Sequence, residues 1–335
     1  MQIFSGSSNP ELARRIAELM AAKSSDHSPK IAPACAGRQG SELLGQLEIS
    51  QFANGETRIV VKEDQVAKEV LVVQSLSIPT NEHLIEFCLI CDALQRAGAA
   101  EITAVVPWMG YSKQDKVFLA GEPLSAKVVA QIIQTTKIKK LITFDLHNRA
   151  IMGFFDIPVI ELSAKSRFLE YFKGQLNRKS SEHLPAQAGS LLQGLELEST
   201  VVVAPDAGSV KASSNFAREL KLPIVYMDKR RDYLSGKVDV MGMSGEVQGQ
   251  HVIIVDDMIV TGSTIMETAK YLKAQGALSV SVAATHHLYV DDVQIKLESS
   301  EIDEIIVTDT VEKIGVSKKL KVLSVAELVV QALQH

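Results

Sequence analysis

Short runs of apolar, often β-branched residues alternate with longer helical patterns along the whole chain. The apolar runs fall at residues 70–73, 102–106, 141–144, 201–203, 252–255 and 305–307. Runs of this length without polar alternation are typical of parallel strands that are covered on both faces. Helical patterns lie between them, for example at residues 81–97 and 263–275. This alternation predicts an α/β fold whose largely parallel central sheets are flanked by helices.

The second half of the chain echoes the first. In both halves a strand leads through a loop to a helix, then to a Gly-Ala pair (Gly98-Ala99 and Gly276-Ala277) and to another strand at the same spacing. A duplicated unit explains this repeat, and a chance resemblance between two strand–helix–strand units is the alternative. A length of 335 residues also suits two domains. We therefore predict an N-terminal domain at residues 1–164 and a C-terminal domain at residues 165–335.

Composition and charge narrow the class of protein. The net charge is -5, and no basic stripe is interleaved with aromatic residues, so nucleic acid is not an expected partner. No apolar run approaches the roughly 20 residues of a membrane helix. The N-terminus lacks a basic region followed by an apolar run, so no secretory signal is expected. We predict a cytoplasmic protein, with stretches 24–45 and 177–199 as polar surface insertions.

Two of the three cysteines, Cys88 and Cys91, form a C-x-x-C pattern inside an apolar stretch with helical spacing. Without a second pair, this spacing favours the buried face of a helix over a metal or redox site.

The strongest candidate for a binding site spans residues 252–264. An apolar strand ends near Asp256 and Asp257, and the loop 261–264, of sequence Thr-Gly-Ser-Thr, leads into a helix. Open α/β sheets bind ligands at the carboxyl ends of their strands, and the amides at a helix N-terminus favour an anion such as phosphate. Gly262 allows a close backbone approach. A ligand with a phosphate at one end and a sugar diol for the carboxylates fits this layout; a helix cap beside a solvated acidic turn is the alternative.

The segment 252–264 resembles the phosphoribosyl-binding motif of type I phosphoribosyltransferases and of ribose-phosphate diphosphokinases. Seven further segments, in the order of the diphosphokinase family, resemble its signatures: residues 3–8, 52–56, 110–115, 145–147, 153–158, 205–208 and 228–231. The resemblance covers nearly the whole chain. It implies two tandem type I phosphoribosyltransferase-like domains. It also implies the synthesis of 5-phosphoribosyl 1-diphosphate and AMP from MgATP and ribose 5-phosphate, for nucleotide biosynthesis.

The resemblance also implies a role for each matching residue. The ribose 5-phosphate site comprises Asp206, Asp256, Asp257, Thr261, Gly262, Ser263 and Thr264. The ATP site comprises Phe52, Asn54, Glu56, Lys113, Gln114 and His147, and its aromatic loop serves a neighbouring subunit of a homo-oligomer built from dimers, such as a hexamer. His147 and Asp206 are associated with Mg²⁺, and Lys229 and Arg231 belong to a mobile catalytic loop.

The implied chemistry needs these residue types. Attack of the ribose 1-hydroxyl on the β-phosphorus of ATP spreads negative charge over phosphoryl oxygens, which cations and Mg²⁺ stabilise. A sparse Mg²⁺ site suffices, because this ion retains waters and uses substrate phosphates as ligands. No G-x-x-x-x-G-K-[ST] pattern occurs in the chain, so it is not a P-loop kinase.

The chain departs from the family pattern at several positions. Lys113 stands where an Arg is usual, apolar residues 117–120 replace a basic stretch, and an Arg is missing near Ala67. Val260 replaces a common acidic residue of the family, and Ser263 and Ser209 each replace a glycine. In many relatives such cations bind phosphate or ADP at an allosteric site, so we predict weak or absent allosteric anion binding here.

Two other functions compete with the diphosphokinase interpretation. A non-catalytic regulatory homologue that binds active subunits would be favoured by loss of the catalytic-loop cations, yet Lys229 and Arg231 are both present. A phosphoribosyltransferase that consumes the diphosphate product would normally have a single domain of this type.

Overall fold

The computed structural model describes residues 1–25, 40–176, 197–231, 238–315 and 317–334. The chain forms two compact units. The first unit comprises residues 1–163, 309–312 and 324–335, and the second comprises residues 164–308 and 313–323. The first change of unit lies beside the predicted boundary at residue 164, but the last residues of the chain return to the first unit. The two stretches expected as insertions are 24–45 and 177–199, and within them residues 26–39 and 177–196 lie outside the described residues.

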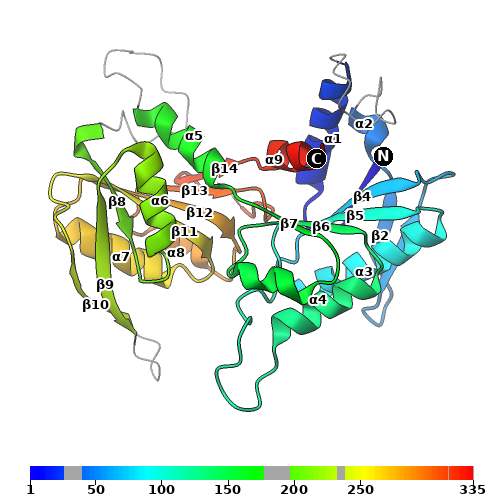
Figure 1. The fold of residues 1–335 in the computed structure, drawn as a ribbon, viewed down its shortest axis with the longest axis horizontal. Helices are drawn as coiled ribbons and strands as arrows, with labels where there is room; N and C mark the ends of the chain where they lie inside the picture. The colour runs from blue at the N-terminus through cyan, green and yellow to red at the C-terminus, as the bar shows by residue number, and fades with distance from the viewer. Residues whose placement is uncertain (26–39, 177–196, 232–237, 316, 335) are drawn as a thin grey trace. The chain divides into compact units, whose positions relative to one another are not determined.

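The first unit is built on a parallel sheet. Its strand order is β1 (Gln2–Ser5), β4 (Glu69–Val73), β5 (Glu101–Val105), β6 (Lys140–Phe144) and β7 (Val159–Leu162). Figure 1 shows helices on both sides of this sheet: α1 (Pro10–Ser25) and α9 (Ala326–Ala332) on one, α3 (Thr80–Arg96) and α4 (Ser125–Thr135) on the other. A hairpin of β2 (Leu47–Gln51) and β3 (Thr57–Val61) packs on α3, and the short helices α2 (Gly40–Leu43) and η2 (Arg149–Phe154) complete the unit.

The core of this unit explains the C-x-x-C pattern. Phe87, Ile90, Cys91 and Leu94 recur at helical spacing and are fully buried on α3. Cys88 is half-buried beside them, and burial raises the pKa of both thiols. Because the thiolate is the reactive and metal-binding form, the pair is structural, as the helical spacing predicts.

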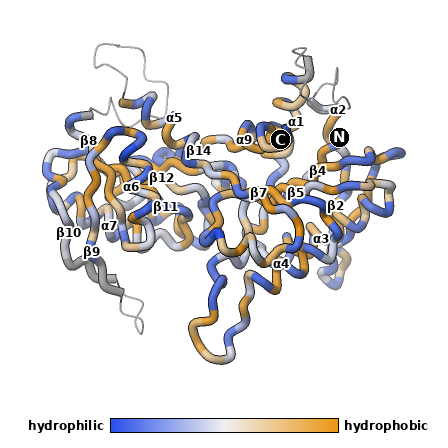
Figure 2. Tube along the Cα trace, viewed as in Figure 1, coloured by the Kyte–Doolittle hydropathy of each residue, from blue (hydrophilic) through white to orange (hydrophobic). Residues whose placement is uncertain are grey.

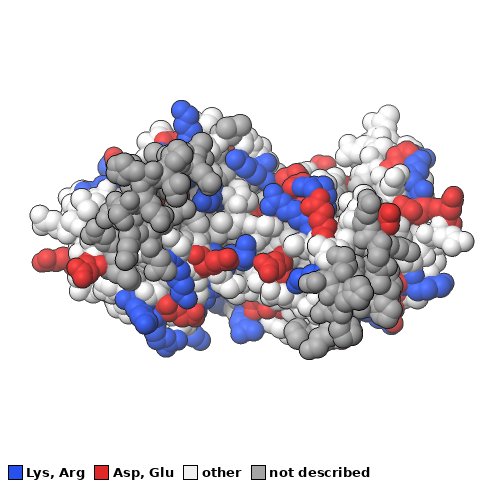
Figure 3. All heavy atoms as spheres, turned by 90° about the horizontal axis from the view of Figure 1, so that it is seen from above, with Lys and Arg blue, Asp and Glu red and all other residues white. Residues whose placement is uncertain are grey.

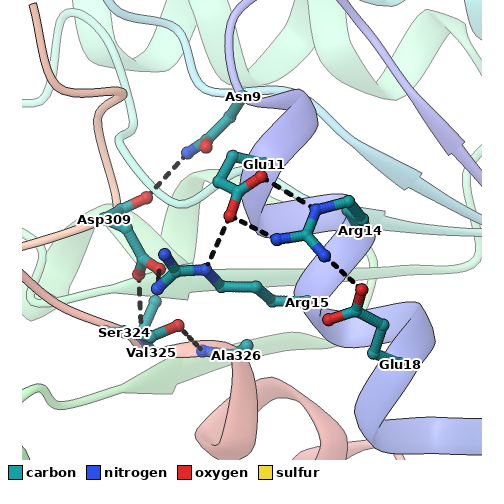
Figure 4. A network of polar contacts seen from close by, with 9 residues as sticks. All are labelled: Asn9, Glu11, Arg14, Arg15, Glu18, Asp309, Ser324, Val325 and Ala326. Atoms are coloured by element: carbon teal, nitrogen blue, oxygen red, sulfur yellow. Dashed lines mark hydrogen bonds and ion pairs between the residues drawn. The ribbon is translucent and has the colours of Figure 1, made fainter.

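The last helix belongs to the first unit because polar contacts attach its N-terminal segment to α1 (Figure 4). Asn9 donates a hydrogen bond from Nδ2 to the backbone oxygen of Asp309 at 2.8 Å, and Arg15 lies 3.5 Å from the Asp309 carboxylate. That carboxylate accepts the Val325 amide at 2.8 Å and a hydrogen bond from the Ser324 hydroxyl. The assignment of all residues after 164 to one domain therefore does not hold for α9.

The second unit is a seven-stranded sheet. Its order is β10 (Val238–Met243), β9 (Ile224–Arg231), β8 (Thr200–Ala204), β11 (His251–Ile259), β12 (Ser279–His287), β13 (Glu304–Thr308) and β14 (Leu320–Leu323). The pair β9–β10 is antiparallel and the other neighbouring strands are parallel. Its helices are α5 (Lys165–Leu176), η3 (Leu197–Ser199), α6 (Val210–Leu220), α7 (Ser263–Ala274) and α8 (Val293–Glu298). With the first sheet, this confirms the predicted α/β fold with largely parallel, helix-flanked sheets.

The Gly-Ala repeat marks the same local structure in both units. Gly98 ends α3 with a φ of 106°, and Gly276 follows α7 with a φ of 86°. Ala99 then donates its amide to Leu94 at 3.0 Å, and Ala277 donates to the equivalent carbonyl of α7 at 3.1 Å. Only glycine takes such a φ without strain, so the shared spacing reflects a shared helix end that turns the chain into the next strand.

Apolar residues lie along the strands of both sheets, and they also occur in the loop after β5 (Figure 2). In that loop Val117, Phe118 and Leu119 are 54%, 75% and 69% exposed. Figure 3 shows both signs of charge interspersed over the described part of the face it draws. None of the described helices is long and apolar enough to cross a membrane.

Candidate active site

The order of the strands in the second unit creates a binding edge between β8 and β11. From β8 the chain passes through α6 to β9 on one side, whereas from β11 it passes through α7 to β12 on the other. Parallel sheets bind ligands outside the carboxyl ends of the two strands where this direction reverses. Asp206 follows β8, and Asp256 and Asp257 lie in the last part of β11, with Ile254 paired to Val203 just before them. The topology thus gathers all three predicted carboxylates at one edge.

The loop after β11 has the form of an anion site. Thr261 and Ser263 are exposed, and their hydroxyl oxygens lie 3.2 Å apart. Gly262 has a φ of 70°, which favours glycine, and a Cβ there would make a tight contact of 3.2 Å with Cγ2 of Val293. The first amides of α7, including that of Thr264, have no partner within the helix and point toward its N-terminal end.

Carboxylate crowding sets the electrostatics of this edge. Burial, followed by the negative charges of Asp257 and Asp206, raises the pKa of Asp256 to about 7. The Asp256 Oδ1 accepts the Asp257 amide at 2.9 Å, which holds the carboxylate in place. A crowded, half-buried group of carboxylates is stabilised by hydrogen-bond donors such as sugar hydroxyls, or by a cation.

Asp206 has the donor chemistry that a magnesium ion requires. Its Oδ1 accepts the Ser209 amide at 2.9 Å, and the Ser209 hydroxyl donates to the Asp206 backbone oxygen at 2.8 Å. No described residue donates a hydrogen bond to Oδ2. A turn-fixed carboxylate with one available oxygen suits a hard cation that keeps most of its waters. The described residues contain no group of three or more His, Cys, Asp and Glu residues that could hold a metal by themselves.

In the first unit, two predicted nucleotide segments meet at the carboxyl ends of the neighbouring strands β5 and β6. Lys113 and Gln114 are exposed in the loop after β5, and His147 is exposed three residues after β6 ends. Asn148 donates from Nδ2 to Oδ2 of Asp115 at 2.6 Å, which joins the two segments directly. A pocket of about 410 Å³ lies beside them, lined by Pro79, Thr80, Asn81, Glu82, Tyr111 and Gln114.

The predicted aromatic loop forms the turn of the β2–β3 hairpin. The Phe52 amide donates to the Glu56 carbonyl at 2.9 Å, and the Glu56 amide donates to the Asn54 side chain at 3.2 Å. Gly55 takes a φ of 87°, as Asn-Gly turns favour. The Phe52 ring is 53% exposed at the tip, so the turn presents an aromatic surface that its own chain leaves uncovered.

The two predicted catalytic cations lie in a strand and not in the expected loop. We expected Lys229 and Arg231 in a loop after an apolar strand, but their backbone lies within β9, where it pairs with Val240 and Val238 of β10. The strand continues because β10 returns antiparallel beside it. The predicted flexible residues 232–236 lie outside the described residues.

The structure thus groups the predicted residues by unit. The ribose 5-phosphate set lies along one edge of the second unit, whereas the six nucleotide residues lie in the first. The predicted metal-associated residues, His147 and Asp206, belong to different units. The sequence did not single out Asn148 or Asp115, because no local pattern indicates a contact across 33 residues.

Comparison with known proteins finds similarity along nearly the whole chain. Residues 1–136 match the family model described as the N-terminal domain of ribose phosphate pyrophosphokinase, and residues 233–335 match a phosphoribosyl synthetase-associated domain. The chain is 34% identical to a ribose-phosphate pyrophosphokinase of Wolinella succinogenes, over 100% of this chain and 95% of that protein. It is also 34% identical to one of Bacillus caldolyticus, over 99% and 93%.

A solved structure extends this similarity to the fold. The crystal structure of phosphoribosylpyrophosphate synthetase from Mycobacterium smegmatis matches with a TM-score of 0.79 and 30% identity, over 99% of this chain and 97% of that chain. The identities, their coverage and this fold together show that the chain belongs to the ribose-phosphate pyrophosphokinase family.

Proposed function

We propose that this protein is an enzyme that transfers the diphosphoryl group of MgATP to the 1-hydroxyl of ribose 5-phosphate. The products are AMP and 5-phosphoribosyl 1-diphosphate, a precursor for nucleotide biosynthesis. The observation that carries the proposal is the edge between β8 and β11, where a carboxylate pair and an anion-binding loop lie side by side in a member of this family.

Ribose 5-phosphate has two chemical ends that suit this edge. Asp256 and Asp257 accept hydrogen bonds from the ribose hydroxyls, and the loop 261–264 and the first amides of α7 bind the 5-phosphate. The raised pKa of Asp256 supports this role, because hydroxyl donors offset the cost of its buried charge.

The nucleotide binds to the first unit, at Lys113, Gln114 and His147. His147 in the first unit would hold the magnesium of MgATP, and Asp206 in the second unit would provide a carboxylate oxygen for magnesium. When bound, the metal neutralises phosphate oxygens as charge shifts during transfer. Lys229 and Arg231 stabilise the negative charge that develops on the transferred group.

The aromatic turn at the tip of the β2–β3 hairpin serves the adenine of a neighbouring subunit. Its exposed Phe52 ring supports this, because an exposed aromatic surface is available for stacking on a base. We therefore propose a homo-oligomer built from dimers. The proposal also includes the cytoplasmic location that the sequence predicts. Retention of Lys229 and Arg231 favours this catalytic role over that of a regulatory homologue.

The deciding experiment supplies ATP, ribose 5-phosphate and Mg²⁺ to the purified protein and separates the nucleotide products. Stoichiometric AMP and 5-phosphoribosyl 1-diphosphate are expected. ADP as the nucleotide product, or no reaction, would refute the proposal.

Subunit mixing tests whether the ATP site is shared between neighbouring subunits. Phe52→Ala and Asp257→Ala proteins are each expected to be nearly inactive, but co-refolded mixtures should regain about a quarter of the parental activity, since a mixed dimer retains one intact site. Mixtures as inactive as their components, or a fully active monomer by light scattering, would contradict a site shared between subunits.

A further inference from the structure

His147 stands in a loop that is fixed on the side facing β7. The amide of Leu146 donates to Oε1 of Glu161 at 3.0 Å, and Nε of Arg149 lies 2.5 Å from Oε2 of the same carboxylate. The Glu161 side chain is only 10% exposed, so this carboxylate is a partly desolvated anchor. The residues immediately before and shortly after His147 are therefore attached to one strand of the sheet.

Asn148 fixes the other side of the loop through both ends of its amide. Its Oδ1 accepts the Ala150 amide at 3.0 Å and caps η2, whereas its Nδ2 donates to Oδ2 of Asp115 at 2.6 Å. Asparagine provides the donor and the acceptor together. An aspartate at residue 148 would keep the cap but would set two carboxylates against each other, and an alanine would lose both contacts.

The segment that Asp115 belongs to is also fixed on its side facing α4. Gln114 is held to the start of α4, because its Oε1 accepts the Ser125 hydroxyl at 2.7 Å and its carbonyl accepts the Ala126 amide at 3.1 Å. The Gln114 amide also donates to the carbonyl of Tyr111 at 2.9 Å. These contacts fix the shape of the segment, whereas the Asp115–Asn148 bond joins it to the His147 loop.

We propose that Asn148 is a positioning residue of the nucleotide site, and that its amide sets the spacing between the Lys113–Gln114 segment and His147. The inference rests on the proposed function, because it takes these three residues as the nucleotide contacts. A preformed spacing removes the entropy cost of ordering two loops when the nucleotide binds. Loss of the amide should raise the KM for ATP by about tenfold, which corresponds to about 1.4 kcal/mol.

The test uses four proteins: Asn148→Ala, Asn148→Asp, Asp115→Asn and the double variant that exchanges the two residues. The exchange restores the bond with reversed polarity, because residue 115 then donates and residue 148 keeps both acceptors. We expect Asn148→Ala to raise the KM for ATP about tenfold and leave the KM for ribose 5-phosphate within twofold. Asn148→Asp should raise the KM for ATP further, and the exchange should bring this KM back to within threefold of the parental value.

Asn215→Ala, at an asparagine of α6 whose side chain accepts from Arg218, is the matched control. Calorimetry with MgATP alone provides a second readout, so a failure of the proposed reaction would not hide the effect on nucleotide binding. An unchanged ATP affinity in Asn148→Ala, equal weakening of both substrates, or no rescue by the exchange would overturn the proposal.

Discussion

Substitution of Asp256 by asparagine should stabilise the ligand-free protein while weakening ribose 5-phosphate binding. The Asp256 carboxyl has a pKa of about 7 because it is buried beside Asp257 and Asp206. In the unfolded chain the same group ionises near its ordinary value of about 3.9. Between these values the folded state holds a proton that the unfolded state has released, so folding stability falls as pH rises through this range.

The magnitude follows from the difference of about three pKa units. At about 1.4 kcal/mol per unit, the full cost above pH 7 is about 4 kcal/mol, and about 3 kcal/mol of it accumulates between pH 5 and pH 8. Asparagine carries no charge and keeps the Oδ1 that accepts the Asp257 amide. Because water entry relieves part of the cost, we expect Asp256→Asn to gain about 2 kcal/mol or more at pH 8 relative to pH 5.

The assay is thermal unfolding of parent and variant without ligands at pH 5 and pH 8. A gain of about 2 kcal/mol corresponds to a Tm increase of about 4 °C or more for a unit of this size. Glu267→Gln, at an exposed carboxylate of α7, is the matched control and should show no such pH dependence. Parallel shifts of Asp256→Asn at both pH values would refute the reasoning, as would undiminished affinity for ribose 5-phosphate.

Three further outcomes are expected. Lys229→Ala should lower turnover by roughly 100- to 1000-fold in steady-state kinetics, with a much smaller effect on substrate binding. Turnover within a fewfold of the parent would show that Lys229 is only a surface charge. Asp257→Ala should weaken ribose 5-phosphate but not ATP in separate calorimetric titrations, and equal weakening would contradict the site. Activity should depend weakly on inorganic phosphate at constant ionic strength, and saturating ATP should relieve ADP inhibition. The physical reason is that residues 117–119 are apolar and exposed, and the Ser324 hydroxyl already donates to the buried Asp309 carboxylate, which repels an anion. A large phosphate requirement would show that other residues bind the anion.

The sequence determined those features that local chemistry encodes. The runs of apolar residues produced the parallel strands, because strands covered on both faces have no polar alternation. The spacing around Gly98 and Gly276 indicated two helix ends, because a positive φ favours glycine independently of the tertiary structure. The order strand, Asp256-Asp257, Thr-Gly-Ser-Thr and helix predicted the binding edge, because strand, loop and helix N-terminus are contiguous in the chain.

Only the tertiary structure decided the features that depend on distant residues. Lys229 and Arg231 extend β9 because β10 pairs beside them, which their own sequence does not indicate. The last helix joins the first unit through Asp309, and Asn148 meets Asp115 across 33 residues. Hydrogen bonds and charge interactions act over a few ångströms in space and carry no fixed spacing along the chain, so the sequence pattern could not report them.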